Sequence, residues 1–141
     1  MSRAEQFSRL FFQFSREYEQ YMERELAPHL TAGQLVVLEF VSGKERVKPS
    51  DLSPYLKTSA AAVTMLLDRM AKNGLIERVR DENDRRIVWI RLTPKGKSAL
   101  QRGISIRERF FQEALASISA HNQRLLLYLF GKLASPSSHN D

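Results

Sequence analysis

The sequence predicts a mainly α-helical chain with one small β-hairpin. Apolar residues recur every three or four positions over most of the chain, which is the period of a helix with one buried face. Residues 75–92 lack this helical period, because two short runs rich in β-branched residues are separated there by a charged turn. We therefore expect a single hairpin with helices on both sides of it.

Two short helices lie directly before the hairpin. The first is expected over residues 51–56 with Ser50 as its N-cap, because a serine oxygen accepts hydrogen bonds from the free N–H groups of a first turn. Residues 57–59 interrupt the pattern, and Thr58 or Ser59 is expected to cap the second helix. The second helix is expected to bury one apolar face, made of Val63, Leu66, Leu67 and Met70.

The second helix is expected to end at Asn73-Gly74, since these residues favour the left-handed turn that follows many helices. Strands are expected over 75–80 and 87–92, and Thr93-Pro94 then supplies the N-cap and first residue of another helix. Helix, turn, helix and hairpin in this order predict a winged helix-turn-helix core. Such a core places its second helix in the major groove of duplex DNA and its hairpin loop, the wing, beside the DNA backbone.

The solvent face of the second helix is the candidate DNA-reading surface. Opposite the apolar stripe are Ala61, Met65, Asp68 and Lys72, flanked by Thr58, Ala62, Thr64 and Arg69. A simply solvated helix face, or a face that packs on another protein, would carry similar residues. The adjacent Arg85 and Arg86 of the wing favour DNA, because two arginines there suit phosphate or minor-groove contacts.

Positive charge is concentrated in the same part of the chain. The whole chain has a formal net charge of +6, from 22 Lys and Arg against 16 Asp and Glu. Residues 44–102 hold 14 of these basic residues and 7 of the acidic ones, so the remainder is close to neutral. A basic unit of this kind is expected to attract the phosphate backbone.

Short motifs occur in a fixed order through this core. They are Leu30-Thr31-Ala32-Gly33-Gln34, Asp51-Leu52, Ala62-Val63-Thr64, Leu67-Asp68-Arg69-Met70, Asn73-Gly74-Leu75-Ile76-Glu77-Arg78, Asp81, Asp84-Arg85-Arg86, Leu92-Thr93 and Lys95-Gly96. In this order and spacing, residues 31–97 resemble the winged-helix core of the MarR family of bacterial transcriptional regulators. The resemblance implies that Arg86 enters the minor groove, that Asp84 orients Arg86, and that Arg85 contacts the DNA backbone.

The start of the second helix departs from the family pattern. Family members often carry more polar side chains where this chain has Ser59-Ala60-Ala61-Ala62. Base reading is therefore expected to rely on methyl contacts to thymine from the alanines and Met65, with Thr64 and Ser59 as hydrogen-bonding groups. This difference concerns which sequence is read rather than whether DNA is bound.

Helices are also expected at both ends of the chain. Residues 4–27 carry a wide aromatic stripe, and Thr31 with Gln34 forms a capping box for a helix that runs to about Phe40. Further helices are expected over 94–116 and 119–133. The last helix is apolar nearly all round, since it contains Leu125-Leu126-Leu127-Tyr128-Leu129-Phe130 and Leu133.

This last helix needs a partner on more than one side. It could be buried inside a monomer, but a chain of this length offers few layers to cover it. We therefore expect a homodimer in which residues 4–27 and 104–133 are dimerisation helices, and MarR-like proteins pair their terminal helices in this way. Two winged helices would then meet an inverted repeat in duplex DNA.

The resemblance also implies a small aromatic or anionic effector in the crevice between the dimer helices and the winged helix. The candidate effector-binding residues are Phe14, Tyr18 and His29, with Phe11 beside them and Arg16 or Arg109 as charge partners. Each of them could equally be an ordinary core or surface residue.

Catalysis is not expected. The chain has no cysteine, and its three histidines are scattered without a carboxylate cluster at metal-ligand spacing, so no metal or cofactor is expected. The acidic residues Asp81, Glu82 and Asp84 are interpreted as ion-pair partners of Arg80, Arg85 and Arg86. No apolar run approaches the roughly 20 residues of a transmembrane helix, and no signal peptide is apparent, so a cytoplasmic protein at the nucleoid is expected.

Residues 1–141 are expected to form one domain with a disordered tail at 135–141. Two functions fit these observations. The first is a ligand-responsive, homodimeric transcriptional regulator, most often a repressor, that binds double-stranded DNA. The second is a winged-helix scaffold that contacts other proteins and does not read DNA.

Overall fold

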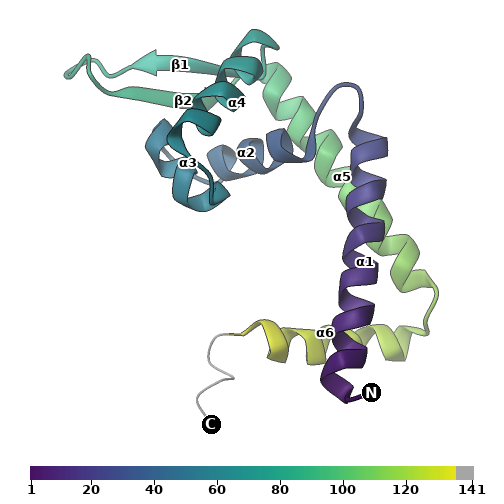
Figure 1. Ribbon diagram of the computed structural model, residues 1–141. Coiled ribbons are helices and arrows are strands. Elements are labelled where there is room, and N and C mark those ends of the chain that lie inside the picture. The colour runs from purple at the N-terminus through teal and green to yellow at the C-terminus, as the bar shows by residue number, and fades with distance from the viewer. Residues whose placement is uncertain (136–141) are drawn as a thin grey trace. The chain divides into compact units, whose positions relative to one another are not determined.

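The structure is a computed structural model that describes residues 1–135. The described part contains six helices and one antiparallel hairpin, which confirms the mainly α-helical fold with a β wing (Figure 1). In chain order the elements are α1 (Arg3–Leu26), α2 (Ala32–Ser42), α3 (Pro49–Leu56), α4 (Ala60–Lys72), β1 (Ile76–Arg80), β2 (Val88–Leu92), α5 (Pro94–Ala116) and α6 (Ala120–Ala134).

The chain divides into two compact units, Met1–Ile106 and the part from Arg107 onward. The first unit contains the winged helix and the hydrophobic core, whose buried members all lie between Met22 and Ile106. The second contains the end of α5 and all of α6. The tail predicted to be disordered lies outside the described residues, apart from Ser135.

Most helix starts follow the predicted capping chemistry, and one does not. Thr31 and Gln34 form the expected reciprocal capping box, with two hydrogen bonds of 3.1 Å. The prediction of Ser50 as an N-cap was wrong, because α3 begins at Pro49, two residues earlier than predicted, and its N-cap is Lys48. Proline suits the first helical position, where its missing N–H would have no partner inside the helix.

The turn between α3 and α4 sets the helix-turn-helix. Lys57 ends α3 in the left-handed region with φ of 54°, a role that glycine usually fills. The Ser53 hydroxyl donates to the Thr58 carbonyl at 2.6 Å, which closes the turn. Ser59 then caps α4, since its Oγ accepts from the Ala62 N–H at 3.1 Å.

The apolar stripe of α4 packs into the core as predicted. Val63, Leu67 and Met70 are buried, and Leu66 is half-buried at the edge of the same face. The helix ends at Asn73, and Gly74 follows with φ of 75°, which confirms the predicted left-handed turn.

β1 and β2 pair antiparallel and form the hairpin that projects from the short helices (Figure 1). Each strand starts one residue later than predicted. A third segment joins the sheet, because the Ile90 N–H donates to the Val47 carbonyl at 2.7 Å. Val47 and Ile90 are buried, so their neighbours along the two segments face the opposite, outer side of the sheet.

Two glycines allow α5 to lie close to the rest of the first unit. A Cβ at Gly96 would lie 2.0 Å from the Leu75 carbonyl oxygen, so only glycine fits where α5 starts. A Cβ at Gly103 would lie 2.5 Å from Cδ1 of Leu35 in α2. The Thr93 Oγ1, which accepts from the Gly96 N–H at 3.0 Å, is the predicted N-cap.

The terminal helices expose large apolar side chains within the described chain. α6 begins after its N-cap Ser119 and has no buried residue, although the predicted apolar run Leu125–Phe130 lies within it. On α1 the side chains of Phe7, Leu10, Phe11, Phe12 and Phe14 are exposed.

Candidate nucleic-acid interface

The predicted reading face of α4 is open to solvent. All eight residues proposed on or beside this helix are exposed: Thr58, Ser59, Ala61, Ala62, Thr64, Met65, Arg69 and Lys72. Met65 is the largest apolar group among them, with 61% of its surface exposed. The face therefore offers methyl and thioether surface at its centre and positive charge toward its C-terminal end.

Two of the three hydroxyl groups on or beside this face, those of Ser59 and Thr64, already have partners in α4. Ser59 Oγ accepts from a backbone N–H, which leaves its own O–H free to donate. Thr64 Oγ1 donates to the Ala60 carbonyl at 3.0 Å, which leaves its lone pairs free to accept. Ser59 is therefore suited to an acceptor on a base edge, and Thr64 to a donor.

An ion pair connects α4 to the wing. Arg78 of β1 donates from Nη2 to Asp68 Oδ1 of α4 at 2.7 Å. This bond links the C-terminal half of α4 to the hairpin. Asp68, which the helical pattern places near the reading face, is thus paired with an arginine of the same chain, although 60% of its side chain is exposed.

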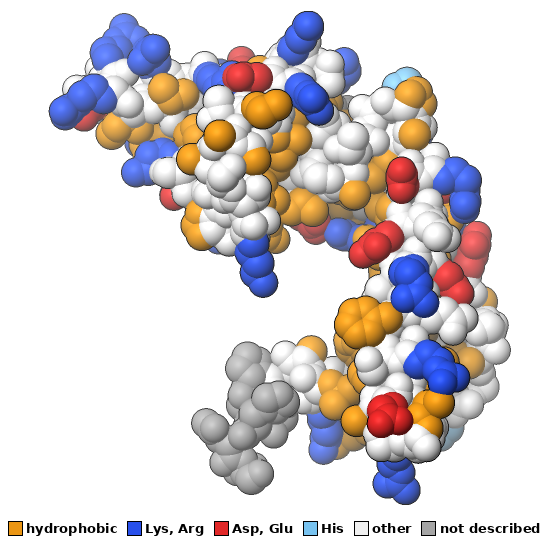
Figure 2. Space-filling model, in the orientation of Figure 1, with side chains coloured by type: hydrophobic (Ala, Val, Ile, Leu, Met, Phe, Trp, Pro, Cys, Tyr) orange, Lys and Arg blue, Asp and Glu red, His pale blue; other side chains and the backbone are white. Residues whose placement is uncertain are grey.

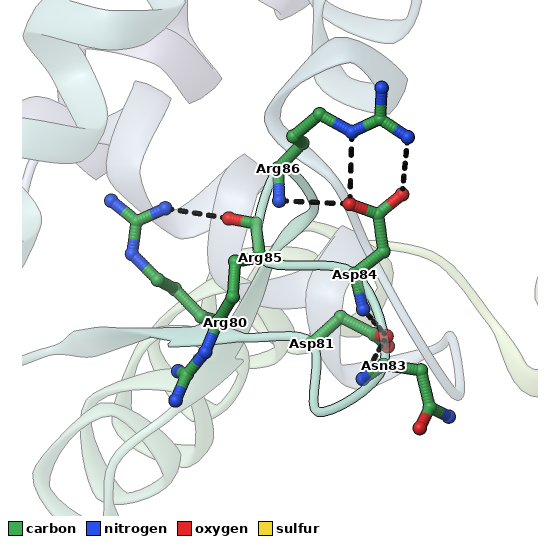
Figure 3. A network of polar contacts seen from close by, with 6 residues as sticks. All are labelled: Arg80, Asp81, Asn83, Asp84, Arg85 and Arg86. Carbon is green, nitrogen blue, oxygen red and sulfur yellow. Dashed lines mark hydrogen bonds and ion pairs between the residues drawn. The ribbon is translucent and has the colours of Figure 1, made fainter.

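The wing tip is organised by the carboxylate of Asp84 (Figure 3). Its Oδ1 accepts from Arg86 Nε at 3.0 Å and from the Arg86 backbone N–H at 3.1 Å, and its Oδ2 accepts from Nη2 at 3.1 Å. This is a bidentate pair, which fixes the plane of a guanidinium as well as its position. Arg86 nevertheless keeps 91% of its side chain exposed, so it remains available to a ligand.

A second carboxylate, that of Asp81, builds the other half of the wing loop. Its Oδ2 accepts from the N–H groups of Asn83 and Asp84, both at 3.0 Å (Figure 3). Its Oδ1 accepts from Trp89 Nε1 at 3.0 Å and lies 3.9 Å from Arg46 Nη1. The sequence interpretation of Asp81 as a partner of the wing arginines was wrong, whereas that of Asp84 was right.

The remaining arginines of the loop differ in what they contact. Arg80 donates from Nη1 to the Arg85 carbonyl at 2.7 Å, which ties the end of β1 to the far side of the loop. Arg85 is exposed. Sequence reasoning gave no role to Trp89 or Arg46, and the Asp-x-Asn spacing of residues 81–83, typical of a turn closed by an aspartate, was the available signal.

Hydrogen bonding makes both carboxylates stronger acids. The pKa of Asp84 is lowered from its ordinary value, first by the Arg86 side chain and then by the Arg86 backbone N–H. The pKa of Asp81 is lowered, first by Trp89 and then by the N–H groups of Asn83 and Asp84. The same pair raises the pKa of Arg86. The network is therefore fully charged at neutral pH.

Lys and Arg side chains gather over the hairpin end of the winged helix (Figure 2). This is the part of the chain in which the sequence concentrates its positive charge. A convex basic wing beside an exposed helix face matches the two contacts that a winged helix makes with duplex DNA.

The candidate effector residues do not all lie at one place on the chain. Phe14 and Tyr18 are one turn apart on α1, with Phe14 exposed and Tyr18 packed against the core. His29 is exposed and lies beyond the end of α1, whose last residue is about 12 Å along the helix from Tyr18. A site made by all three would need a large ligand or a contribution from a second copy.

Among residues 1–135, no group of three or more histidine and carboxylate side chains is placed to hold a metal ion. The described helices include none that is both long and apolar enough to cross a membrane.

The fold and the wing define this chain as a winged helix-turn-helix protein. A family model described as the MarR family matches residues 30–88. The chain is 30% identical over 104 residues to an uncharacterised HTH-type transcriptional regulator of Bacillus subtilis, YdgJ, a match that covers 74% of this chain and 63% of YdgJ. It is 29% identical over 129 residues to the transcriptional regulator HosA of Escherichia coli, which covers 89% of this chain and 95% of HosA.

Solved structures agree with these sequence matches. A mutant of Escherichia coli MarR, solved in complex with operator DNA, superposes with a TM-score of 0.69 at 26% identity, over 91% of this chain and 93% of that one. The chain belongs to the MarR family. It spans about three fifths of the length of YdgJ and two further Bacillus subtilis relatives.

Proposed function

We propose that this chain is a transcriptional regulator that binds double-stranded DNA through α4 and the wing. The observation that carries the proposal is the Asp84–Arg86 pair, which presents an exposed, oriented guanidinium on a basic loop beside a capped and solvent-open helix. Arg86 would enter the minor groove and Arg85 would contact the backbone. The chain would act in the cytoplasm, without catalysis or a cofactor.

The reading face of α4 would contact base edges in the major groove. Ser59 and Thr64 would supply a donor and an acceptor, as their existing hydrogen bonds dictate. Ala61, Ala62 and Met65 would contact thymine methyl groups. Thr58, Arg69 and Lys72 would reach phosphates at the two ends of the helix.

The regulator would act as a homodimer on an inverted repeat. Support comes from α6, whose apolar side chains are exposed along the whole helix within the described chain. A second copy would cover them together with the apolar face of α1, so that residues 1–141 form one dimer-forming domain. Half-site centres would be about 10–10.5 bp apart, one turn of DNA.

An effector would release the DNA, which makes repression the most natural mode of control. A ligand near Phe14, Tyr18 and His29 would favour a dimer whose two α4 helices have the wrong spacing. DNA and effector would then oppose each other reciprocally, with a coupling of about 1–3 kcal/mol. Titration of DNA-bound protein with aromatic acids, repeated on Tyr18→Ala and His29→Ala, tests this. Equal release from both variants would place the site elsewhere.

The DNA-binding proposal is tested by its dependence on salt. A dimer that makes about 8–10 phosphate contacts should lose about three to five decades of affinity between 50 and 200 mM salt. The measurement is fluorescence polarisation of labelled genomic fragments. Affinity that is flat over this range would favour the alternative, a scaffold that contacts proteins only; its one supporting feature is the alanine-rich start of α4.

Two variants separate base reading from phosphate contact. Arg86→Ala should weaken binding by about 1–3 kcal/mol and change the A·T preference at the edges of the half-site. Lys72→Ala should weaken binding to all sequences alike and leave the preferred sequence unchanged. An unchanged footprint and affinity in Arg86→Ala would contradict the assignment of the wing.

A further inference from the structure

The wing loop is folded by its own carboxylates rather than by apolar packing. Its residues from Glu82 to Arg86 are exposed or half-buried, so the core does not determine their conformation. Asp81 and Asp84 together accept five hydrogen bonds from the loop: from the N–H groups of Asn83, Asp84 and Arg86, and from Nε and Nη2 of Arg86. The place of Arg86 therefore depends on where these two carboxylates are held.

Asp84 cannot determine its own position, because it lies in the loop. Its backbone N–H is held by Asp81 Oδ2 at 3.0 Å, and its carbonyl accepts from the Ile87 N–H at 3.0 Å. Asp81 lies at the end of β1, where its N–H pairs with the Ile87 carbonyl at 3.0 Å. The loop is thus attached to the sheet through Asp81, beside the bond from Arg80 Nη1 to the Arg85 carbonyl.

The other carboxylate oxygen of Asp81, Oδ1, accepts a hydrogen bond from Trp89. The indole Nε1–H donates to Oδ1 at 3.0 Å, so that one carboxylate oxygen holds the loop while the other is held by the sheet. Only 17% of the Asp81 side chain is exposed, so water competes little for either oxygen. Rotation of this carboxylate would break its bonds to Asn83 and Asp84 together.

Trp89 is itself fixed from a third part of the chain. The guanidinium of Arg46 lies 5.3 Å and the ammonium of Lys48 lies 6.0 Å from the centre of its ring. Both cations flank Val47, whose carbonyl accepts from the Ile90 N–H at 2.7 Å. Arg46 also lies beside the same Asp81 oxygen, at 3.9 Å. The segment before α3 therefore holds the ring against the wing.

We propose that Trp89 is a positioning residue for DNA binding: through Asp81 it holds the wing loop in the conformation that presents Arg86. This rests on the proposed function, because it assumes that Arg86 contacts DNA. Without the indole N–H, Asp81 gains rotational freedom and the loop samples more conformations. Binding must then order the loop again, and this cost lowers the affinity for DNA.

A double-mutant cycle separates this role from a general loss of stability. Trp89→Phe keeps an aromatic ring at this position and removes the indole N–H that donates to Asp81, together with the five-membered ring that carries it. It should weaken DNA binding by about three- to tenfold, the range that one hydrogen bond contributes. In the Arg86→Ala background the same change should weaken binding less than about twofold, because the group that it positions is absent. A loss of equal size in both backgrounds would overturn the proposal.

Measurements without DNA test the effect of Trp89 on the loop itself, and the DNA affinities separate failure of the proposed function from failure of the role of Trp89. The amide resonances of Asn83, Asp84 and Arg86 in Trp89→Phe should move toward random-coil values without DNA. The melting temperature should fall by no more than about 4 °C, as for the loss of one half-buried hydrogen bond. If wild-type protein does not bind DNA, the proposed function fails. If wild type binds, Arg86→Ala is weakened and Trp89→Phe equals wild type, only the role of Trp89 fails.

Discussion

The wing and the last helix are both exposed, yet their surfaces differ in kind. In the wing loop, Asp81 and Asp84 bond to neighbouring groups and hold the loop in one conformation. In α6, large apolar side chains such as Leu126 and Leu129 are open to solvent in the described chain. A polar surface that is ordered by the chain itself can present ready-made contacts to a ligand. An apolar surface of this extent requires cover, because leaving it in water is unfavourable.

The comparison predicts that negative charge on α6 disrupts dimerisation, whereas negative charge on the reading face of α4 does not. In the proposed dimer, Leu126→Asp with Leu129→Asp should raise the dissociation constant by at least about a thousandfold, because each copy would lose two leucines that its partner covers, worth about 2 kcal/mol apiece. Sedimentation velocity at micromolar concentration measures the change. DNA affinity should fall with it, since a monomer engages one half-site.

Met65→Asp is the control, because it replaces an exposed apolar residue of α4 by aspartate, with one added negative charge against two in the double substitution. It should leave the dimer intact and weaken only DNA binding. The comparison breaks down if wild type sediments as a folded monomer, or if Met65→Asp disrupts the dimer as strongly as the double substitution.

The second prediction concerns α5, which starts at the wing and ends in the second unit. Gly96→Ala should lower the free energy of unfolding by about 3 kcal/mol, because its Cβ would lie 2.0 Å from the Leu75 carbonyl and a backbone atom cannot move aside cheaply. Gly131→Ala in α6 meets no atom within 4 Å and should raise it by about 1 kcal/mol through helix propensity. Urea unfolding of both variants checks the difference, and equal effects would contradict it.

The sequence predicted the features that depend on neighbouring residues, and it missed those that depend on distant segments. Local chemistry predicted the capping box at Thr31, the left-handed Gly74 and the buried stripe of α4, because each depends on neighbours within one or two turns. The prediction of a Ser50 cap was wrong because the neighbouring Pro49 is the stronger signal for a helix start, and this signal is also local.

Contacts between distant segments were out of reach of a sequence pattern. The position of Arg46 over the Trp89 ring depends on the pairing of Val47 with Ile90, which the sequence did not predict. The charges of the wing were visible from the sequence, whereas which arginine each carboxylate holds was not. The pair of Asp84 with Arg86 was assigned correctly through the resemblance to the MarR family, which implied that Asp84 orients Arg86.

The smallest predicted effect is the response of the wing to acid. The pKa values of Asp81 and Asp84 in the folded chain lie below the ordinary value, so both carboxylates stabilise the loop while they are charged. Their contribution is fully present above about pH 4, the ordinary aspartate value, and is lost as the pH falls through the lowered pKa values. Because the loop is exposed, this loss should loosen the wing and leave the core folded.

Trp89 is the only tryptophan, so its fluorescence reports on this transition directly. Its emission should change with a midpoint below pH 4, while circular dichroism of the helices stays constant until lower pH. Asp81→Asn should abolish the fluorescence transition, since the titrating partner of the indole is then absent. No apolar contact of α6 titrates in this range, so dimerisation should not share the midpoint. A common midpoint for fluorescence and dimer dissociation would show that the two surfaces are coupled rather than independent.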